Sequence, residues 1–254
     1  MKKTLLLYAF SGSLILSACS THYQLAGIER TRLTVDSRYD ANPDAAAAAF
    51  LVPYKHQVDS IMGPIMGEVA HNMTADRPES DLSNLLSDIL VWAAKDYGET
   101  PVLGVYNMGG IRAALVKGKV TYGDVLDIAP FENKIAFTTL SGAKLLELFR
   151  QIARRGGEGV SHGCELVISK SGELLSARLH GAEIDPQASY RLTTIDYLLG
   201  GNDGMPALGE GTDVNSPQEV SNNTRFIIMN YFKEKAAHGE VVDAQVEGRI
   251  RIGD

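Results

Sequence analysis

Three segments of the chain combine glycines with polar or aromatic residues directly beside apolar stretches. They occupy residues 107–112 (Asn-Met-Gly-Gly-Ile-Arg), 121–133 and 194–204. Loops at strand ends are where proteins usually place binding residues, because a rigid scaffold positions them. Taken singly, each segment is also consistent with a plain turn or, for Phe131, with a core aromatic residue.

The residues that most often carry metal or nucleophilic chemistry are not arranged for it. The six histidines form no H-x-H or H-E-x-x-H pattern and no zinc-type pair with a cysteine. We therefore expect no metal site and no cofactor in this chain. Ser161-His162 and Cys164 lack the G-x-S-x-G turn and the third partner of a hydrolase triad, so Cys164 is predicted to be a buried structural thiol. The glycine-rich segments match neither a P-loop nor a dinucleotide fingerprint.

The charge of the chain argues against nucleic acid as a partner. Its formal net charge is −7 at pH 7, from 24 basic and 31 acidic residues. A net acidic protein does not attract a polyanion through its overall field. It can still hold one phosphorylated small molecule through a few local arginines.

The N-terminus has the pattern of a bacterial lipoprotein leader. Two lysines precede an apolar run over residues 5–16, which is too short to span a membrane. The following Leu-Ser-Ala-Cys is similar to a lipobox, so we expect residues 1–18 to be removed and Cys19 to be lipidated. An ordinary signal peptide with an incidental cysteine is the alternative. Two or more acyl chains would anchor the protein without a spanning helix. Ser20 after the cysteine favours the outer membrane, facing the periplasm.

The remaining chain is predicted to be a short tether over residues 19–43 and one domain over residues 44–254. Apolar periodicity and turn residues predict helices over 44–60, 82–97, 121–128, 141–155 and 218–237. They predict strands over 31–35, 65–69, 102–106, 134–140, 164–169, 174–179, 190–196 and 246–252. Because helices and strands alternate irregularly, with consecutive strands in the second half, we expect a mixed α/β domain rather than a doubly wound parallel sheet.

Particular residues are expected to begin and end these elements. Asp81 is placed to cap the 82–97 helix and Gly98 to end it. Thr121 and Asp124 have the spacing of a capping box. Pro53 should kink the 44–60 helix or mark its true start.

The order and spacing of the three segments resemble the C-terminal domain of the 5′-nucleotidase and UDP-sugar hydrolase family. That domain carries N-x-G-G-I-R, then a Thr/Ser-Tyr-x-Asp helix leading to P-F-x-N, then a strand that ends in an aromatic residue and a G-G-D-G turn. Here these are residues 107–112, 121–133 and 190–204. The resemblance covers residues 44–237. It implies the family's fold, with mixed sheets and flanking helices.

The resemblance also implies roles for individual residues. Phe131 and Tyr197 would clamp the base between their rings, Asn107 would hydrogen-bond the base, and Asn133 could assist. Asp203 would accept from the ribose hydroxyls. Two further residues would be cationic contacts: Arg112 would orient the phosphate or ribose, and Arg77 matches a second family arginine with its spacing off by about one residue.

Two departures from the family pattern could shift the substrate preference. The glycine turn reads Gly-Gly-Asn-Asp-Gly, with Asn202 inserted before the acid, and the second ring is Tyr197 where phenylalanine is common. The tyrosine hydroxyl must find a partner or water.

In that family, an N-terminal metallophosphatase domain performs the hydrolysis with two metals. Its D-x-H and G-N-H-E motifs do not occur in this chain, so the chain is expected to correspond to the substrate-recognising half alone. A purely structural domain whose site has decayed is a third possibility, and the presence of Asn107, Arg112, Phe131 and Asp203 argues against it. Two functions remain open. The chain is either one part of a split nucleotidase that works with a separate metallophosphatase chain, or a nucleoside- or nucleotide-binding lipoprotein without catalysis.

Overall fold

The computed structural model describes residues 25–253, which form two separately compact parts. The boundary between residues 1–51 and 52–254 falls inside helix α2 (Ala45–Met62). The predicted leader and Cys19 lie outside the described residues. Within residues 25–253, no helix combines the length and the apolar character that a membrane span requires.

The first part contains little regular structure in its described range. A 3₁₀ turn, η1 (Ser37–Tyr39), is capped by the Asp36 side chain, and residues 25–51 are all exposed. The strand predicted over residues 31–35 is wrong, because no segment of the described chain pairs with it. The alanine-rich helix is confirmed. Asp44 caps its start by accepting from the amides of Ala46 and Ala47, and Pro53 lies inside the helix and does not mark its start.

The second part holds the remaining elements. Its strands are β1 (Ile65–Val69), β2 (Leu103–Tyr106), β3 (Gly118–Thr121), β4 (Ile135–Ser141), β5 (Gly159–Val160), β6 (Cys164–Ser169), β7 (Leu174–Leu179), β8 (Ala182–Glu183), β9 (Ser189–Ile195), β10 (Thr212–Asn215) and β11 (Ile250–Gly253). Its helices are α3 (Asp81–Ala93), α4 (Tyr122–Ile128), α5 (Gly142–Arg154), α6 (Asp196–Leu199) and α7 (Thr224–Ala237). Short 3₁₀ turns are η2 (Ala94–Tyr97), η3 (Met108–Gly110), η4 (Pro206–Glu210) and η5 (Val220–Asn222).

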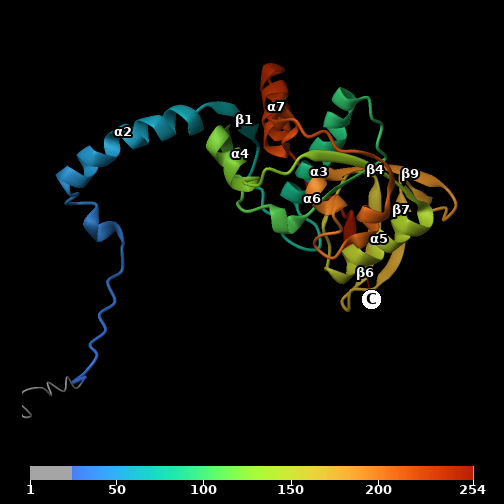
Figure 1. The fold of residues 1–254 in the computed structure, drawn as a ribbon, viewed down its shortest axis with the longest axis horizontal. Coiled ribbons are helices and arrows are strands. Elements are labelled where there is room, and N and C mark those ends of the chain that lie inside the picture. Colours follow the sequence, from blue (N-terminus) through green and yellow to red (C-terminus); the bar gives the residue numbers. More distant parts are fainter. Residues whose placement is uncertain (1–24, 254) are drawn as a thin grey trace, which may run out of the picture. The chain divides into compact units, whose positions relative to one another are not determined.

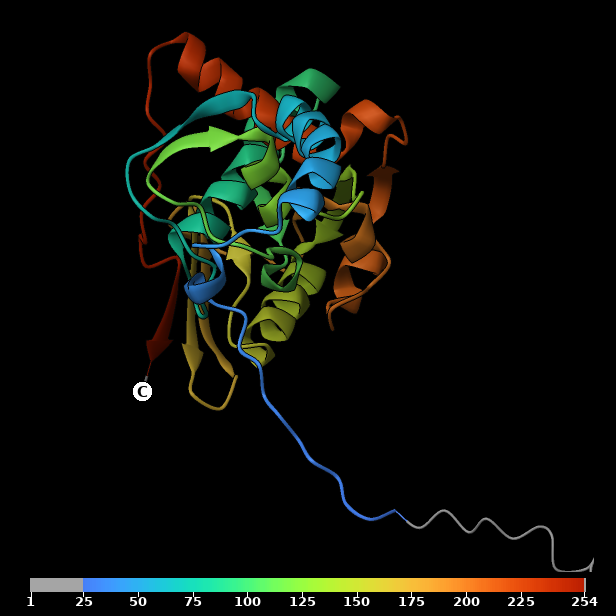
Figure 2. The same cartoon turned by 90° about the vertical axis from the view of Figure 1, so that its left-hand side faces the viewer.

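The strands form three sheets of mixed direction. The central sheet has the order β10-β4-β9-β2-β5, in which only β2 and β9 run parallel. A second sheet has the order β11-β6-β7-β8. Its strand β11, at the C-terminal end of the chain, runs parallel to β6 (Figure 2). β1 and β3 form a separate antiparallel pair. The mixed α/β fold class predicted from the sequence is confirmed.

Three helices cover these sheets. α3 packs on β2, β5 and β9 of the central sheet and against α7, which also covers β1. α5 packs against β4 and β9 of the central sheet and against β6 and β7 of the second sheet, so it lies between the two (Figure 1). This position explains the strong separation of apolar and polar faces along α5, since one of its faces meets two sheets.

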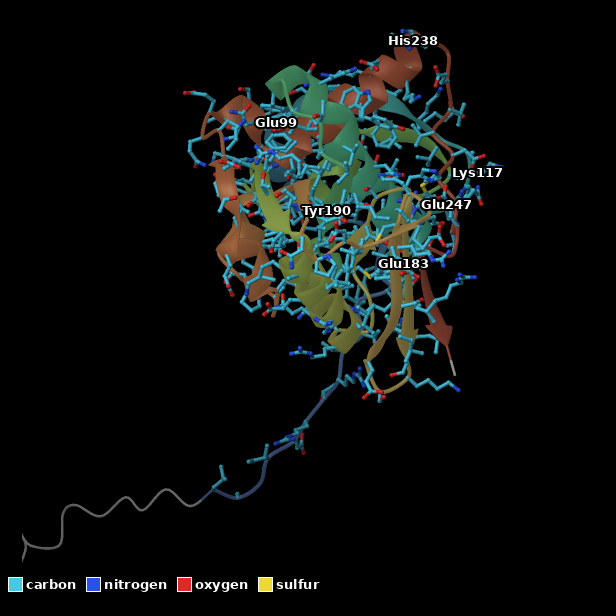
Figure 3. All side chains as sticks on the ribbon, turned by 90° about the vertical axis from the view of Figure 1, so that its right-hand side faces the viewer. Glu99, Lys117, Glu183, Tyr190, His238 and Glu247 are labelled. Carbon is cyan, nitrogen blue, oxygen red and sulfur yellow. The ribbon has the colours of Figure 1, made fainter. Side chains whose placement is uncertain are left out.

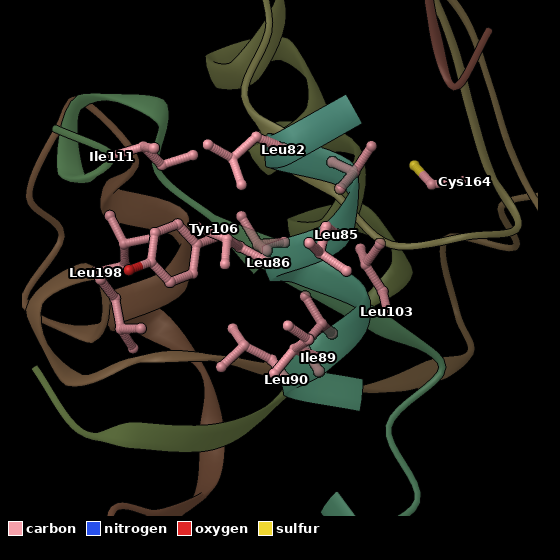
Figure 4. Close-up of a cluster of buried hydrophobic side chains, with 14 of the residues drawn as sticks. Leu82, Leu85, Leu86, Ile89, Leu90, Leu103, Tyr106, Ile111, Cys164 and Leu198 are labelled. Atoms are coloured by element: carbon pink, nitrogen blue, oxygen red, sulfur yellow. The ribbon is translucent and has the colours of Figure 1, made fainter. Parts of the chain in front are cut away.

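The apolar stripe predicted along residues 82–97 forms the centre of the core. Leu82, Leu86, Ile89 and Leu90 of α3 are at most 1% exposed, and Figure 4 shows them facing Tyr106 and Leu198. Burying each such side chain contributes roughly 1.5–3 kcal/mol of transfer free energy. Cys164 is buried as predicted, and its burial raises the pKa of its thiol. In contrast, Lys117, Glu183 and Glu247 are exposed on the outer surface (Figure 3).

Most element boundaries agree with the sequence predictions, and three require correction. Ser80, not Asp81, caps α3, because the Ser80 hydroxyl accepts from the amide of Ser83 in a reciprocal capping box. The last helix begins at Thr224 rather than near residue 218, since Asn223 caps it. The closing strand begins at Ile250, where pairing with β6 starts. The capping box of Thr121 and Asp124 is confirmed, as is the left-handed Gly98 after η2.

Candidate functional site

The topology of the central sheet brings the three predicted segments to one edge. β2 and β9 run parallel, so the loops that follow them, starting at Asn107 and Asp196, emerge at the same edge. β4 runs antiparallel to β9 with Ile135 opposite Ile195, so the segment that enters β4 also lies there. Residues far apart in the sequence therefore become neighbours.

A pocket lies at this edge. Its lining residues are Asn107, Gly109, Gly110, Phe131, Asn133, Arg155, Tyr197 and Asp203. Five of the seven predicted substrate-binding residues are among them. Phe131 is 47% exposed and Tyr197 40% exposed, so both rings are open to solvent rather than packed in the core. The cavity of about 210 Å³ is several times the ~30 Å³ that water occupies in the liquid, so it has room for an organic ligand.

Two larger hollows, of about 500 and 530 Å³, lie elsewhere on the second part of the chain. The first surrounds His162, His180 and Arg249, and the second lies over β6 and β7. Neither is lined by a phenylalanine, tyrosine or tryptophan ring. Among the pockets of the described residues, the sheet-edge pocket is distinguished by two such rings combined with an acid, amides and a cation, which is the usual composition of a small-molecule site.

Asp203 is the centre of the polar contacts in the pocket. The Asn107 amide donates to its Oδ2 at 2.6 Å, and the Tyr197 hydroxyl donates to its Oδ1 at 3.1 Å. This bond is the main cause that raises the pKa of the Tyr197 hydroxyl. Asp203 adopts a left-handed backbone with φ of 52°, a conformation that Asp tolerates better than most residues because its short side chain bonds locally.

The orientation of the Asn107 amide follows from this contact. An ionised carboxylate only accepts hydrogen bonds, so the nitrogen of the amide must face Asp203. The amide oxygen then lies beside Gly110, where an added Cβ would stand 2.7 Å from it. Asn107 is 4% exposed, and its Oδ1 has no hydrogen-bond partner among the described residues. Because buried acceptors are almost always paired, this oxygen is an exception within the described part of the chain.

Short-range hydrogen bonds fix the position of Tyr197. The Asp196 carboxylate accepts from the amides of Tyr197 and Lys134, at 2.8 and 3.1 Å, and so joins the ring to the entrance of β4. The side chain of the inserted Asn202 donates to the Tyr197 carbonyl at 2.7 Å. The departure from the family turn thus gives the second ring an additional support.

The first turn of α7 holds the segment that carries Phe131 and Asn133. The Asn133 carbonyl accepts from the amide and the hydroxyl of Thr224, at 2.8 and 3.1 Å. The Pro130 carbonyl accepts from Arg225 at 2.7 Å. Both ends of the segment are therefore anchored, while the Phe131 ring stays exposed.

Two predicted arginines do not line the pocket. Arg112 is exposed, donates to the Gly109 carbonyl at 3.3 Å and lies 6.0 Å from the centroid of the Phe131 ring. Arg77 donates to the Gly157 carbonyl at 2.9 Å and forms an ion pair with Glu158. Their contact with a phosphate or ribose remains a prediction.

Arg155 lines the pocket and was missed by the sequence analysis, because no family motif includes it. A topological signal could have found it. β4 leaves the pocket, its seven residues rise roughly 24 Å, and the thirteen residues of α5 return roughly 20 Å. The residue after α5 must therefore lie close to the start of β4. Ser141, which caps α5 by accepting from the amide of Lys144, makes the reversal tight.

The side chains of this pocket are suited to stacking and hydrogen bonding. Its rings offer flat apolar faces, Asp203 accepts, Asn107 and Asn133 both donate and accept, and Arg155 donates. Within residues 25–253, no group of three or more His, Cys, Asp or Glu side chains could hold a metal ion. The expectation that this chain needs no cofactor is not tested by the structure.

The fold and the pocket together define a mixed α/β domain with an aromatic-lined pocket at the edge of its central sheet. Residues 62–210 match the family described as the C-terminal domain of 5′-nucleotidase, and the chain belongs to that family. The resemblance stated from the sequence motifs is thereby confirmed.

Individual relatives agree with this assignment. An apyrase from Tabanus yao is 30% identical over 60% of this chain and 30% of its own length. The silent protein UshA(0) from Salmonella typhimurium is 25% identical over 77% of this chain and 35% of its own length. The crystal structure of a 5′-nucleotidase precursor from Thermus thermophilus matches with a TM-score of 0.70 at 25% identity, covering 84% of this chain and 44% of that chain. The chain thus spans about a third of the length of the UshA relatives it matches.

Proposed function

We propose that the sheet-edge pocket binds a nucleoside or nucleotide, with the base between Phe131 and Tyr197. The observation that carries the proposal is that two half-exposed rings from distant segments line one cavity together with an acid and two amides. Stacking tolerates different bases, since every base has a π-face, and contributes about 1–3 kcal/mol per base.

The polar groups have complementary roles in this proposal. Asn107, which lines the pocket, hydrogen-bonds the base, and Asn133 adds a second amide at the same pocket. Asp203 accepts from the ribose hydroxyls, with Arg112 at the outer side of the Phe131 ring for a phosphate or ribose. Arg77 would act there only after leaving Glu158.

We propose that hydrolysis, where it occurs, requires a metallophosphatase domain or chain in addition to these residues. Stacking and hydrogen bonding recognise a nucleotide, but attack on a phosphate in this family's chemistry uses metal-activated water. The alternative is a binding lipoprotein without catalysis. Phosphate release from AMP by this chain, with and without a metallophosphatase encoded beside it, separates the two. Release by this chain alone would contradict the proposal.

The binding proposal is tested by calorimetric titration of the folded protein with adenosine, uridine and AMP. Phe131→Ala and Asp203→Ala should each weaken binding by about 1–3 kcal/mol without unfolding the domain. Phe131→Ala should leave the thermal transition in place, because the ring is exposed, whereas Asp203→Ala should also lower it, because the buried Asn107 amide loses its acceptor. Tyr39→Ala, which removes an exposed ring in the first part of the chain, is the matched control. Unchanged affinity in both pocket variants would rule out the ring clamp.

We also propose that the protein is exported and lipid-anchored through Cys19. The support is the pattern of the first nineteen residues alone. Incorporation of labelled palmitate into the wild type, and its loss in Cys19→Ala, is the corresponding test. Labelling of the variant at the wild-type level would exclude this anchor.

A further inference from the structure

A buried carboxylate lies beneath the pocket and joins three segments. The Glu158 side chain is 0% exposed. Its Oε1 accepts from the guanidinium groups of Arg77 and Arg155, and its Oε2 accepts from the Met108 amide at 2.6 Å. Burying a carboxylate is unfavourable unless it is paired and hydrogen-bonded, and here both oxygens are used. Met108 follows Asn107, so the same carboxylate also holds the amide-bearing loop of the pocket.

Arg155 uses only part of its guanidinium for this contact. Its Nε donates to Glu158, whereas neither terminal nitrogen makes a hydrogen bond within the described part of the chain. Nη2 lies 3.9 Å from Oδ2 of Asp203, too far for a hydrogen bond. The side chain is 29% exposed and lines the cavity. Arg155 therefore presents fixed, unused donors next to the acid.

We propose that Arg155 is a ligand-binding residue that reads the sugar hydroxyls together with Asp203, and that Glu158 is the residue that positions it. This inference rests on the proposed function and adds a requirement for the vicinal diol of ribose. A hydroxyl donates through its hydrogen and accepts through its oxygen. An acid and a cation side by side can therefore bind the same hydroxyl, which donates to the acid and accepts from the cation. A deoxy sugar lacks this hydroxyl and makes neither contact.

The loop geometry explains why the carboxylate is needed at position 158. Gly157 has a φ of 114°, and an added Cβ would lie 2.1 Å from the Pro78 carbonyl oxygen, so the loop passes directly against the segment of Arg77. Three donors converge on Glu158 from both sides. A glutamine has one acceptor oxygen, and its NH₂ group would face a donor. Glu158→Gln should therefore loosen Arg155, although the two side chains have nearly the same shape.

The decisive experiment compares the affinities of the protein for adenosine and for 2′,3′-dideoxyadenosine. Both are measured by calorimetry, and the second also by its displacement of bound adenosine. In Arg155→Met, adenosine affinity should fall by about tenfold or more, because hydrogen bonds to charged groups are the strong ones, while dideoxyadenosine affinity changes less than about twofold. Arg154→Met is the matched control, since it removes the neighbouring, exposed arginine of the same helix end. It should leave both affinities unchanged.

Different failures have different meanings. If the wild type binds neither adenosine nor AMP, the proposed function fails, and this inference fails with it. If the wild type binds adenosine but Arg155→Met retains the full preference for the diol, Arg155 is not a sugar contact, and only this inference is overturned.

Glu158→Gln tests the positioning role, after its fold has been verified by circular dichroism. It should lower the ratio of the adenosine and dideoxyadenosine affinities in the same direction as Arg155→Met. An equal loss of affinity for both nucleosides would show that Glu158 supports the fold rather than Arg155. If Glu158→Gln does not fold, the ratio of the two affinities is measured instead on Glu158→Asp at reduced temperature. A ratio equal to that of the wild type would overturn the positioning role.

Discussion

Two arginine–carboxylate clusters in this protein have opposite arrangements. Beneath the pocket, a fully buried acid, Glu158, lies between two partly exposed arginines. Near the start of β11, a buried arginine, Arg249, whose side chain is 5% exposed, lies between two partly exposed acids, Asp88 and Glu247. The first cluster has an excess of positive charge and the second an excess of negative charge.

The clusters also differ in the use of their donors. Arg249 donates through Nε to Glu247, through Nη1 to Asp88 and the Val160 carbonyl, and through Nη2 to Asp88. Its guanidinium is used at every nitrogen, so the cluster is complete without a ligand. Arg155 leaves its terminal nitrogens unbonded within the described residues, and its side chain lines a cavity. If Arg155 binds the ligand as proposed, unused donors on a fixed side chain distinguish a binding cluster from a structural one more clearly than the presence of an ion pair does.

Removing the buried arginine should give the largest effect. Arg249→Met leaves the Val160 carbonyl and two acids without their donor, and should lower the free energy of unfolding by about 2–4 kcal/mol. Denaturant titration measures this loss. Nucleoside affinity of the folded fraction should not change. The exposed Arg251→Met is the control and should change stability by less than about 0.5 kcal/mol. A stable Arg249→Met protein would contradict the structural role.

A smaller effect is expected from removing one internal bond of the pocket. Tyr197→Phe keeps the ring but frees Oδ1 of Asp203 for the ligand. Because a net hydrogen bond contributes about 0.5–1.5 kcal/mol, adenosine affinity should rise by roughly two- to tenfold. Affinity for 2′,3′-dideoxyadenosine should stay constant in the same titrations. A loss of adenosine affinity would instead mean that the tyrosine hydroxyl itself contacts the ligand.

The smallest effect should come from His71, a residue that does not line the pocket. The Asn72 carbonyl, and to a lesser degree that of Ala244, raises the pKa of His71 against the opposing effect of burial. A raised folded-state pKa contributes stability that is fully present below the unfolded value near 6.5 and is lost as pH rises through the folded value. Stability should therefore decline modestly between pH 6 and pH 8. His71→Gln should flatten this pH dependence in denaturant titrations. Adenosine affinity should respond neither to this substitution nor to the change in the protonation of His71.

The sequence could predict the elements whose signals are local. α3 has an uninterrupted apolar stripe, α4 begins with a capping box, and β6 and β7 were predicted at the residues where they occur. The short strands β3, β5, β8 and β10 were not predicted, because each is defined by its pairing partner rather than by an apolar pattern of its own. The strand predicted over residues 31–35 was wrong because this segment has the alternating apolar pattern of a strand but no partner strand to pair with.

The pocket shows the same division between local and distant information. Asn107, Phe131, Asn133, Tyr197 and Asp203 were found because they stand in motifs. Arg155 was not, because its place depends on the matched lengths of β4 and α5. The engagement of Arg77 with Glu158 was also invisible, since eighty-one positions separate the two residues. Side chains that act through a tertiary partner carry no sequence pattern of their own.

The gathering of remote segments at one sheet edge has a consequence for the maturation of the protein. Residues from 107 to 203 contribute to the pocket, so no shorter fragment and no partly folded chain presents a complete site. Occupancy by a nucleoside would favour only the finished chain, by about 2.7 kcal/mol at a hundredfold excess over the dissociation constant. Abundance of the ligand would then extend the lifetime of the protein against proteases that remove unfolded chains.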